Sequence, residues 1–116
     1  MSDRRTDVPL LATLAAARTA PPQAGRASAL MMTHGTLELR YYAPRGRDPQ
    51  QPHTRDEVYI VASGRGSFVC DGERVSFGPG DALFAPAAAE HRFEDFTDDF
   101  GTWVIFYGPE GGERPG

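Results

Sequence analysis

The sequence predicts an all-β fold, an antiparallel sandwich or barrel of short strands preceded by one short helix. After Ala29, short apolar or alternating segments follow one another and are separated by turn-forming residues. Glycine and proline are frequent, with 13 and 10 copies in 116 residues, which favours many turns over long helices. A series of at least seven such segments is typical of a sandwich or a barrel.

Residues 8–18 are predicted to form the helix. Asp7 can cap its first turn, Pro9 is tolerated there, and Leu10, Leu11 and Leu14 form a narrow apolar stripe. The proline- and glycine-containing stretch that follows ends the helix and acts as a linker. The predicted division of the chain is a helix and linker at 1–29, a barrel at 30–110 and a flexible tail at 111–116.

The predicted strands come next in the chain. Asp71-Gly72 separates two of them and is a strong signal for a two-residue hairpin, because both turn residues need positive φ. The strand segments are LMMTHGTLELRYYA (30–43), EVYIVAS (57–63), GSFVC (66–70), ERVSF (73–77), DALFAP (81–86), HRFEDF (91–96) and TWVIFYG (102–108).

Composition and charge exclude several classes of function. The net charge is −4, which argues against a nucleic-acid partner because phosphate binding needs clustered basic residues. No apolar run approaches the ~20 residues of a membrane span, so no membrane partner is expected. The single cysteine, Cys70, excludes an intrachain disulfide and fits a reducing cytoplasm, where we expect the protein to lie. Cys70 is interpreted as a small buried hydrophobe, with a reactive thiol as the alternative.

A histidine and a carboxylate near the start of one predicted strand suggest a site. On a straight strand at about 3.3 Å per residue, His53 and Glu57 would lie about 13 Å apart. We therefore expect residues 54–56 to bend, so that both side chains point to one place in the barrel. Polar groups facing a barrel interior cost free energy unless something pairs them.

Two spaced motifs complete this pattern, and through them the chain resembles the cupin superfamily. The first cupin motif is G-x5-H-x-H-x3-4-E-x6-G, and its second His, its Glu and its last Gly match His53, Glu57 and Gly64. The second motif is G-x5-P-x-G-x2-H-x3-N. Its first Gly, its Pro and its His match Gly80, Pro86 and His91. Ala88 stands in place of its second Gly, and Asp95 stands in place of its Asn. The resemblance covers about residues 30–108 and implies a double-stranded β-helix (cupin, or jelly-roll) barrel.

The resemblance also implies a metal site. Cupins hold one divalent ion with two His and one Glu from the first motif and one His from the second. The implied ligands here are His53, Glu57 and His91, with Gln51 where the first His belongs. The amide oxygen of Gln51 either completes an oxygen-rich site or marks a site with weakened metal affinity. The implied cofactor is one divalent ion, namely iron, manganese, zinc or nickel.

Alternation along the strands nominates residues that contact a small-molecule ligand. Tyr59 and Phe93 lie two residues from Glu57 and His91, and so should share their inward face. Arg40, Tyr42 and Trp103 are expected from neighbouring strands. Aromatic residues in small barrels also serve as core filler, and that alternative stays open for each of them.

Three kinds of function follow from these observations. The metal could serve an enzyme acting on a small organic molecule, as an oxygenase, isomerase or lyase. The alternative is a non-catalytic small-molecule binder with a degenerate metal site. A third possibility is an interaction module. A barrel of this size with an exposed strand edge also predicts a homodimer, with residues 28–42 helping to cover an edge.

Overall fold

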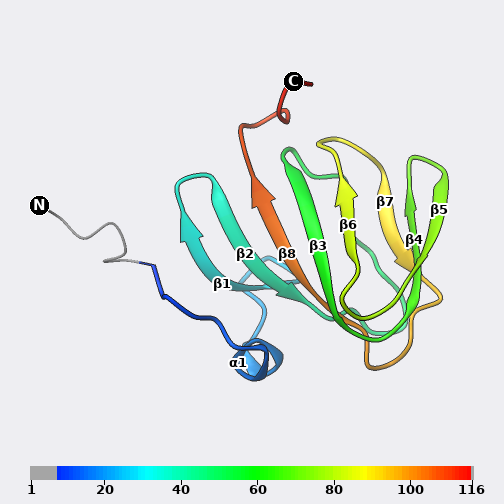
Figure 1. Ribbon diagram of the computed structural model, residues 1–116, viewed down its shortest axis with the longest axis horizontal. Coiled ribbons are helices and arrows are strands. Elements are labelled where there is room, and N and C mark those ends of the chain that lie inside the picture. Colours follow the sequence, from blue (N-terminus) through cyan, green and yellow to red (C-terminus); the bar gives the residue numbers. More distant parts are fainter. Residues whose placement is uncertain (1–7, 116) are drawn as a thin grey trace, which may run out of the picture.

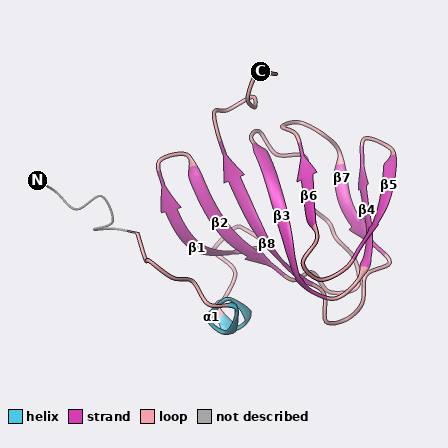
Figure 2. Cartoon of the chain, in the orientation of Figure 1, coloured by secondary structure: helices cyan, strands magenta, loops and turns pink. Residues whose placement is uncertain are grey.

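A computed structural model describes residues 8–115 and confirms the predicted all-β fold. Within that part of the chain, eight strands form two antiparallel sheets, and one short helix precedes them (Figures 1 and 2). In chain order the elements are α1 (Leu14–Thr19), β1 (Ala29–His34), β2 (Leu37–Tyr42), β3 (Asp56–Ser63), β4 (Gly66–Cys70), β5 (Glu73–Phe77), β6 (Ala82–Ala85), β7 (His91–Glu94) and β8 (Gly101–Tyr107).

The last strand holds the larger sheet together. The strand order is β1-β2-β8-β3-β6 in the five-stranded sheet and β5-β4-β7 in the three-stranded sheet. Figure 1 shows β8, the last strand of the chain, between β2 and β3 at the centre of the larger sheet. The chain therefore crosses repeatedly between the two sheets, and residues far apart in sequence come to lie side by side.

The register of β8 defines the inner face of the larger sheet. Phe106 lies opposite Glu57, and Val104 lies opposite Tyr59. Directly opposed residues of an antiparallel pair project from the same face, so these four side chains point the same way. All four are buried. Glu57 therefore projects into the interior between the two sheets.

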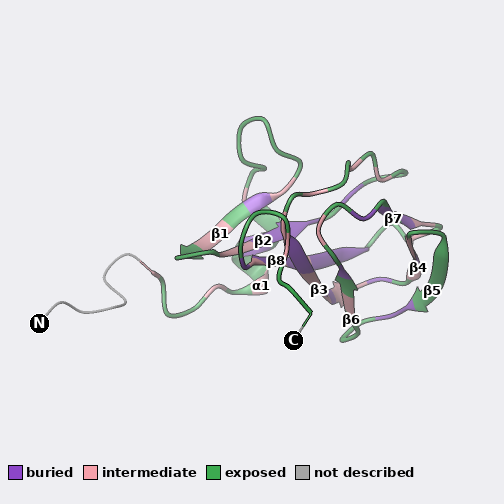
Figure 3. Cartoon of the chain, turned by 90° about the horizontal axis from the view of Figure 1, so that it is seen from above, coloured by how far each residue is buried: buried purple, intermediate pink, exposed green. Residues whose placement is uncertain are grey.

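Aromatic rings fill that interior. Phe93 on β7 lies at the centre of the cluster, with ring centroids 4.7 to 5.6 Å from those of four neighbours. The neighbours are Tyr59, Phe68, Phe77 and Phe100. Figure 3 shows the buried segments gathered along β2, β8 and β3. Edge-on and tilted ring packing of this kind stabilises a core beyond its buried area alone.

The helix starts later than predicted. The helix α1 begins at Leu14, and the hydroxyl of Thr13 caps it by accepting a hydrogen bond from the Ala16 N–H at 3.1 Å. The prediction of a helix from residue 8 was wrong, because Leu10 and Leu11 are 80% and 73% exposed and have no apolar surface to pack against. The predicted cap Asp7 lies outside the described residues. No helix within residues 8–115 is long and apolar enough to cross a membrane.

The predicted hairpin at Asp71-Gly72 is confirmed. The two residues connect β4 and β5 with φ values of 49° and 84°, and Cys70 pairs with Glu73 on either side of them. These angles fit the turn type that matches the twist of the two strands. Cys70 itself is half-buried.

The strand β1 forms one edge of the larger sheet. It pairs with β2 on its other side, with a register shift between Leu30 and Met32. The homodimer in which residues 28–42 cover a strand edge stays a prediction. The division of the chain at residues 29 and 110 also stays a prediction.

Ala88, in the loop between β6 and β7, has a φ of 68° and is exposed. This left-handed conformation costs an L-residue about 1–2 kcal/mol. The cost is tolerated here because the Ala88 N–H donates a hydrogen bond to the carbonyl of His53 at 2.7 Å. The cupin motif has glycine at this position, which adopts such angles without strain.

We therefore expect Ala88→Gly to stabilise the protein. The free energy of unfolding should rise by about 1 kcal/mol, which corresponds to about 4 °C in Tm for a domain of this size. Thermal unfolding monitored by circular dichroism checks this. Ala87→Gly is the matched control and should destabilise, because Ala87 is not among the residues with positive φ. Equal destabilisation by both substitutions would contradict the expectation.

Candidate metal centre

Three side chains from three parts of the fold meet between the sheets. Glu57 is the second residue of β3, in the larger sheet, and its side chain is 1% exposed. His91 is the first residue of β7, in the smaller sheet, and its side chain is also 1% exposed. His53 belongs to the segment between β2 and β3 and is half-buried. The predicted bend between His53 and Glu57 is confirmed, since β3 begins only at Asp56.

The Glu57 carboxylate lies between the two imidazole rings. His53 Nδ1 lies 2.7 Å from Glu57 Oε1, and His91 Nε2 lies 2.8 Å from the same oxygen. One ligand atom from each of the three residues lies within 4.8 Å of the others. The predicted convergence of these three residues is confirmed, and the cluster could hold a metal ion.

Two atoms of the cluster fit a metal better than they fit a closed hydrogen-bond network. Glu57 Oε2 and His91 Nε2 are buried without a well-aligned hydrogen-bond partner. The other ring nitrogen of His91, Nδ1, lies 2.9 Å from the carbonyl of Ala89. A carbonyl only accepts, so Nδ1 carries the proton and the neutral ring offers Nε2 as a metal ligand. Two imidazoles and one carboxylate are a donor set suited to divalent iron, manganese, zinc or nickel.

Interactions within the cluster shift the pKa values of Glu57 and His91 more strongly than burial does, and in the opposite direction. Burial alone would raise the pKa of Glu57, but the two histidines hold it below its ordinary value. Burial alone would lower the pKa of His91, but Glu57 and the Ala89 carbonyl raise it above its ordinary value. Without a metal, the arrangement therefore favours a charged pair of Glu57 and His91.

Backbone contacts position the start of β3. Asp56 is buried and accepts hydrogen bonds from the N–H groups of Ala87, at 2.9 Å, and Glu113, at 2.8 Å. The Gly111 N–H donates to the Thr54 carbonyl at 2.7 Å. The residues between His53 and Glu57 are thus held from both the β6–β7 loop and the segment after β8.

Gln51, the predicted fourth ligand, is exposed and does not line the pocket beside His53 and Glu57. The preceding residue, Gln50, lines it instead. Gln51 was predicted from its place in the cupin motif, where the first His belongs, but this part of the segment before β3 is not a strand, so motif spacing alone does not set the direction of its side chain. The Gln50 amide oxygen accepts a hydrogen bond from the Tyr59 hydroxyl at 3.2 Å, and its nitrogen donates to Asp48. Gln50 is therefore held in place by residues around the pocket.

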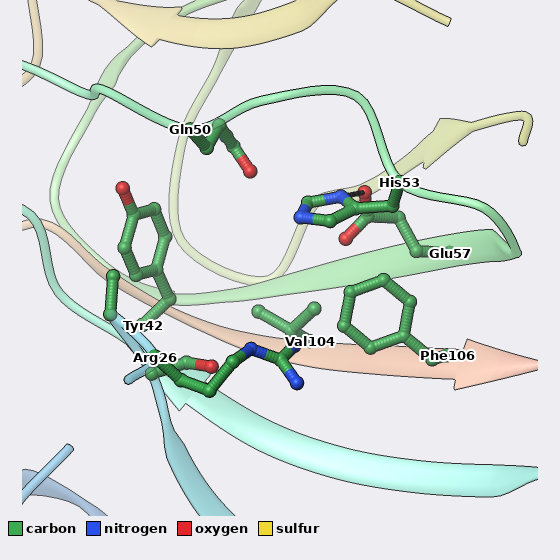
Figure 4. A pocket seen from close by; sticks show the side chains of 9 residues that line it. Arg26, Tyr42, Gln50, His53, Glu57, Val104 and Phe106 are labelled. Carbon is green, nitrogen blue, oxygen red and sulfur yellow. Dashed lines mark hydrogen bonds and ion pairs between the residues drawn. The ribbon is translucent and has the colours of Figure 1, made fainter. Parts of the chain in front are cut away.

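A small pocket, with a cavity volume of about 60 Å³, opens beside the cluster (Figure 4). This cavity is smaller than the usual sites for drug-sized ligands, so it fits only a small molecule or part of one. Val104 and Phe106 of β8 give it an apolar wall, and the His53 ring packs edge-on against Phe106 at 5.0 Å. The lining residues are Arg26, Ala27, Ser28, Tyr42, Gln50, His53, Glu57, Val104 and Phe106.

Of the residues nominated for ligand contact, only Tyr42 lines this pocket. Tyr59 and Phe93 belong to the buried aromatic core, which is the alternative left open for them. Arg40 is 3% exposed and is held by Glu38 and Gln23. Trp103 packs edge-on against Tyr41 at 5.5 Å, outside the pocket lining.

Other residues line the pocket in their place, and these were not predicted. On β8, Val104 and Phe106 face the site, whereas the predicted Trp103 points to the opposite face of the strand. Phe106 lies opposite Glu57 across the β3–β8 pair, and this register is set by tertiary pairing rather than by a signal in the sequence. Arg26 lies in the predicted linker, where no periodic signal marks it.

Comparison with protein families agrees with the motifs. The family model described as "Cupin domain" matches residues 38–106, which is more than half of the chain. The matched region contains His53, Glu57 and His91.

Known proteins resemble the chain over different lengths. An uncharacterized protein from Streptomyces coelicolor is 36% identical over 63 residues, which are 54% of this chain and 60% of that protein. The match thus spans less than two thirds of that relative. A putative mannose-6-phosphate isomerase from Ralstonia eutropha has a TM-score of 0.60 at 22% identity, over 87% of this chain and all of that chain. A chain from the crystal structures of two DMSP lyases has a TM-score of 0.53 at 28% identity, over 64% of this chain and 38% of that chain.

Removing His91 should abolish metal binding. After metal removal and titration with zinc, wild-type protein should bind one ion, and His91→Ala should bind none, because a buried ligand is lost that water cannot replace in this geometry. Gln51→Ala is the control and should bind like wild type, because its side chain is exposed. Metal content by mass spectrometry checks both. Equal zinc content in wild type and His91→Ala would contradict the assignment.

Metal affinity should fall as the pH is lowered. His91 must be neutral to bind, and its pKa in the metal-free protein is raised, so proton competition begins above the ordinary histidine value of about 6.5. The stabilisation that the raised pKa gives the metal-free fold is present at low pH and is lost as pH rises through the folded-state pKa. Zinc titrations against a chromogenic chelator from pH 5.5 to 8.5 measure the effect. An affinity that stays constant over this range would contradict it.

Proposed function

The chain belongs to the cupin family, and from that premise we propose that it is a metal-binding cupin acting on a small organic molecule. The observation that carries the proposal is the convergence of His53, Glu57 and His91 beside a small pocket, with two buried atoms that lack a well-aligned hydrogen-bond partner. The resemblance to a putative isomerase and to DMSP lyases supports an isomerase or lyase, and an oxygenase is also compatible with the donor set.

His53, Glu57 and His91 would hold the ion, which supplies Lewis-acid polarisation of a bound oxygen or, as iron, dioxygen chemistry. The ligands come from a loop and two sheets, so the ion would also tie these elements together. Glu57 has a lowered pKa and is therefore ionised, as a metal ligand must be.

Two tyrosine hydroxyls beside the cluster remain protonated at neutral pH. Burial raises the pKa of Tyr59, and so does the charge of Glu57. Burial also raises the pKa of Tyr42, together with its hydrogen bond to Asp48. These hydroxyls therefore serve as hydrogen-bond donors that hold Gln50 and Asp48 in place rather than as general bases. We infer that Tyr42, Val104 and Phe106 serve as walls of the pocket rather than as reactive groups.

One observation favours the alternative, a non-catalytic small-molecule binder. The polar groups of Tyr42, Tyr59 and Gln50 already form hydrogen bonds with protein partners. Among the described residues, the pocket thus offers no second acid–base pair beside the metal cluster. A binder needs no such pair, and an enzyme would depend on the ion for its chemistry.

A time-resolved binding experiment separates the two functions. Ligand-observed NMR on protein loaded with iron, manganese, zinc or nickel first identifies small molecules that bind. Proton NMR then follows each bound molecule over hours. For an enzyme we expect conversion by the metal-loaded wild type, loss of conversion on metal removal, and at least a hundredfold slower conversion by Glu57→Gln. Binding without conversion under every metal would instead establish the non-catalytic binder.

A further inference from the structure

Arg26, an exposed residue, brings a positive charge to the pocket. It lies in the segment before β1 and lines the pocket together with His53 and Glu57. Figure 4 shows its side chain extending along the pocket, across from Gln50 and His53. Within residues 8–115, its guanidinium forms no ion pair and no hydrogen bond, whereas the nearby Arg40 and Arg55 form both.

The neighbouring arginines Arg40 and Arg55 already donate hydrogen bonds to protein groups. Arg40 Nε donates to Glu38 at 2.8 Å, and Arg40 Nη2 donates to Gln23 at 2.7 Å. Arg55 pairs with the other oxygen of Glu38 and donates to the Thr36 carbonyl. One carboxylate thus serves two arginines, and an excess of positive charge remains beside Arg26.

The charge of Arg26 is disfavoured by its surroundings. Burial lowers its pKa, and repulsion from Arg40 and Arg55 lowers it further, against attraction by Glu38 and Glu57. An anionic group in the pocket would reverse this imbalance, because it would face the guanidinium in a partly desolvated site.

We propose that the substrate of this site is a small organic carboxylate, and that Arg26 binds its carboxylate group. The proposal rests on the proposed function and names its substrate class. A guanidinium presents paired N–H donors that match the two oxygens of a carboxylate. The single positive charge of the guanidinium balances the single negative charge of one carboxylate.

The rest of the pocket fits the remainder of such a molecule. A cavity of about 60 Å³ admits only a small ligand or part of one, and Val104 and Phe106 offer apolar contact between Arg26 and the metal cluster. The carboxylate would therefore be held at the arginine, with a short apolar or aromatic part extending toward His53 and Glu57.

Matched pairs of acids and amides test the proposal. The probes are acetate against acetamide and benzoate against benzamide, titrated by NMR into zinc-loaded and metal-free protein. In wild type we expect each acid to bind more tightly than its amide. Arg26→Gln should weaken binding of the acid about tenfold and leave the amide unchanged, because only the acid loses a charge-assisted pair. Arg26→Lys keeps the charge without the paired donors, so its affinity for the acid should lie between those of wild type and Arg26→Gln.

The control is Arg47→Gln, which makes the same change of charge at an arginine that is also exposed but lies outside this pocket. It should leave the preference for acids intact. If no acid binds more tightly than its amide, or if Arg26→Gln and Arg47→Gln have equal effects, the proposal is overturned. A preference that survives Arg26→Gln but disappears on zinc removal also overturns it, since the ion would then bind the acid.

Metal content separates this proposal from the function on which it rests. Arg26→Gln should retain the zinc content of wild type, because Arg26 is not a ligand. If wild type binds no metal and still prefers acids through Arg26, the anion site stands and the metal-dependent function falls. If metal binds normally and the preference is absent, the metal-dependent function stands and the carboxylate proposal falls.

Discussion

Burial of the Glu57 carboxylate between two imidazole rings is the interaction on which the rest of the site depends. A carboxylate that is 1% exposed costs several kcal/mol unless neighbouring groups compensate its charge. His53 reaches it from the segment before β3, and His91 reaches it from the opposite sheet. The two sheets and the connecting segment must therefore be in register for this residue to be tolerated. Glu57 Oε2 and His91 Nε2 nevertheless lack a well-aligned hydrogen-bond partner, which makes the cluster suitable for an ion.

Two further carboxylates hold the segment that carries His53. Asp48 accepts hydrogen bonds from the Tyr42 hydroxyl and from the Phe93 N–H, so that it joins β2 to β7. Asp56 accepts backbone N–H groups from the β6–β7 loop and from the segment after β8. Both ends of the connection between β2 and β3 are thus fixed by buried or half-buried acids. Such contacts around a metal cluster orient its ligands, so their loss would act on affinity through geometry.

The charge around the pocket differs in sign from the charge of the chain. The protein carries a net charge of −4, yet Arg26, Arg40 and Arg55 gather on one side of the site around Glu38. A local field that opposes the net charge raises the concentration of ligands of the matching sign at the mouth of a pocket. The net charge of the whole chain therefore does not describe which ligands the pocket itself attracts.

The sequence by itself determined the strand series, the Asp71-Gly72 hairpin and the spacing of the three cluster residues. These features depend on alternation, turn geometry and motif spacing, all of which are local along the chain. Tertiary structure alone decided that Gln50 rather than Gln51 lines the pocket, because strand alternation does not extend into the irregular segment before β3. It also decided which face of β8 points inward, since a shift of one residue reverses every side chain and only pairing with β3 sets the register. Arg26 reaches the pocket for the same reason: packing between distant segments, rather than any local pattern, places it there.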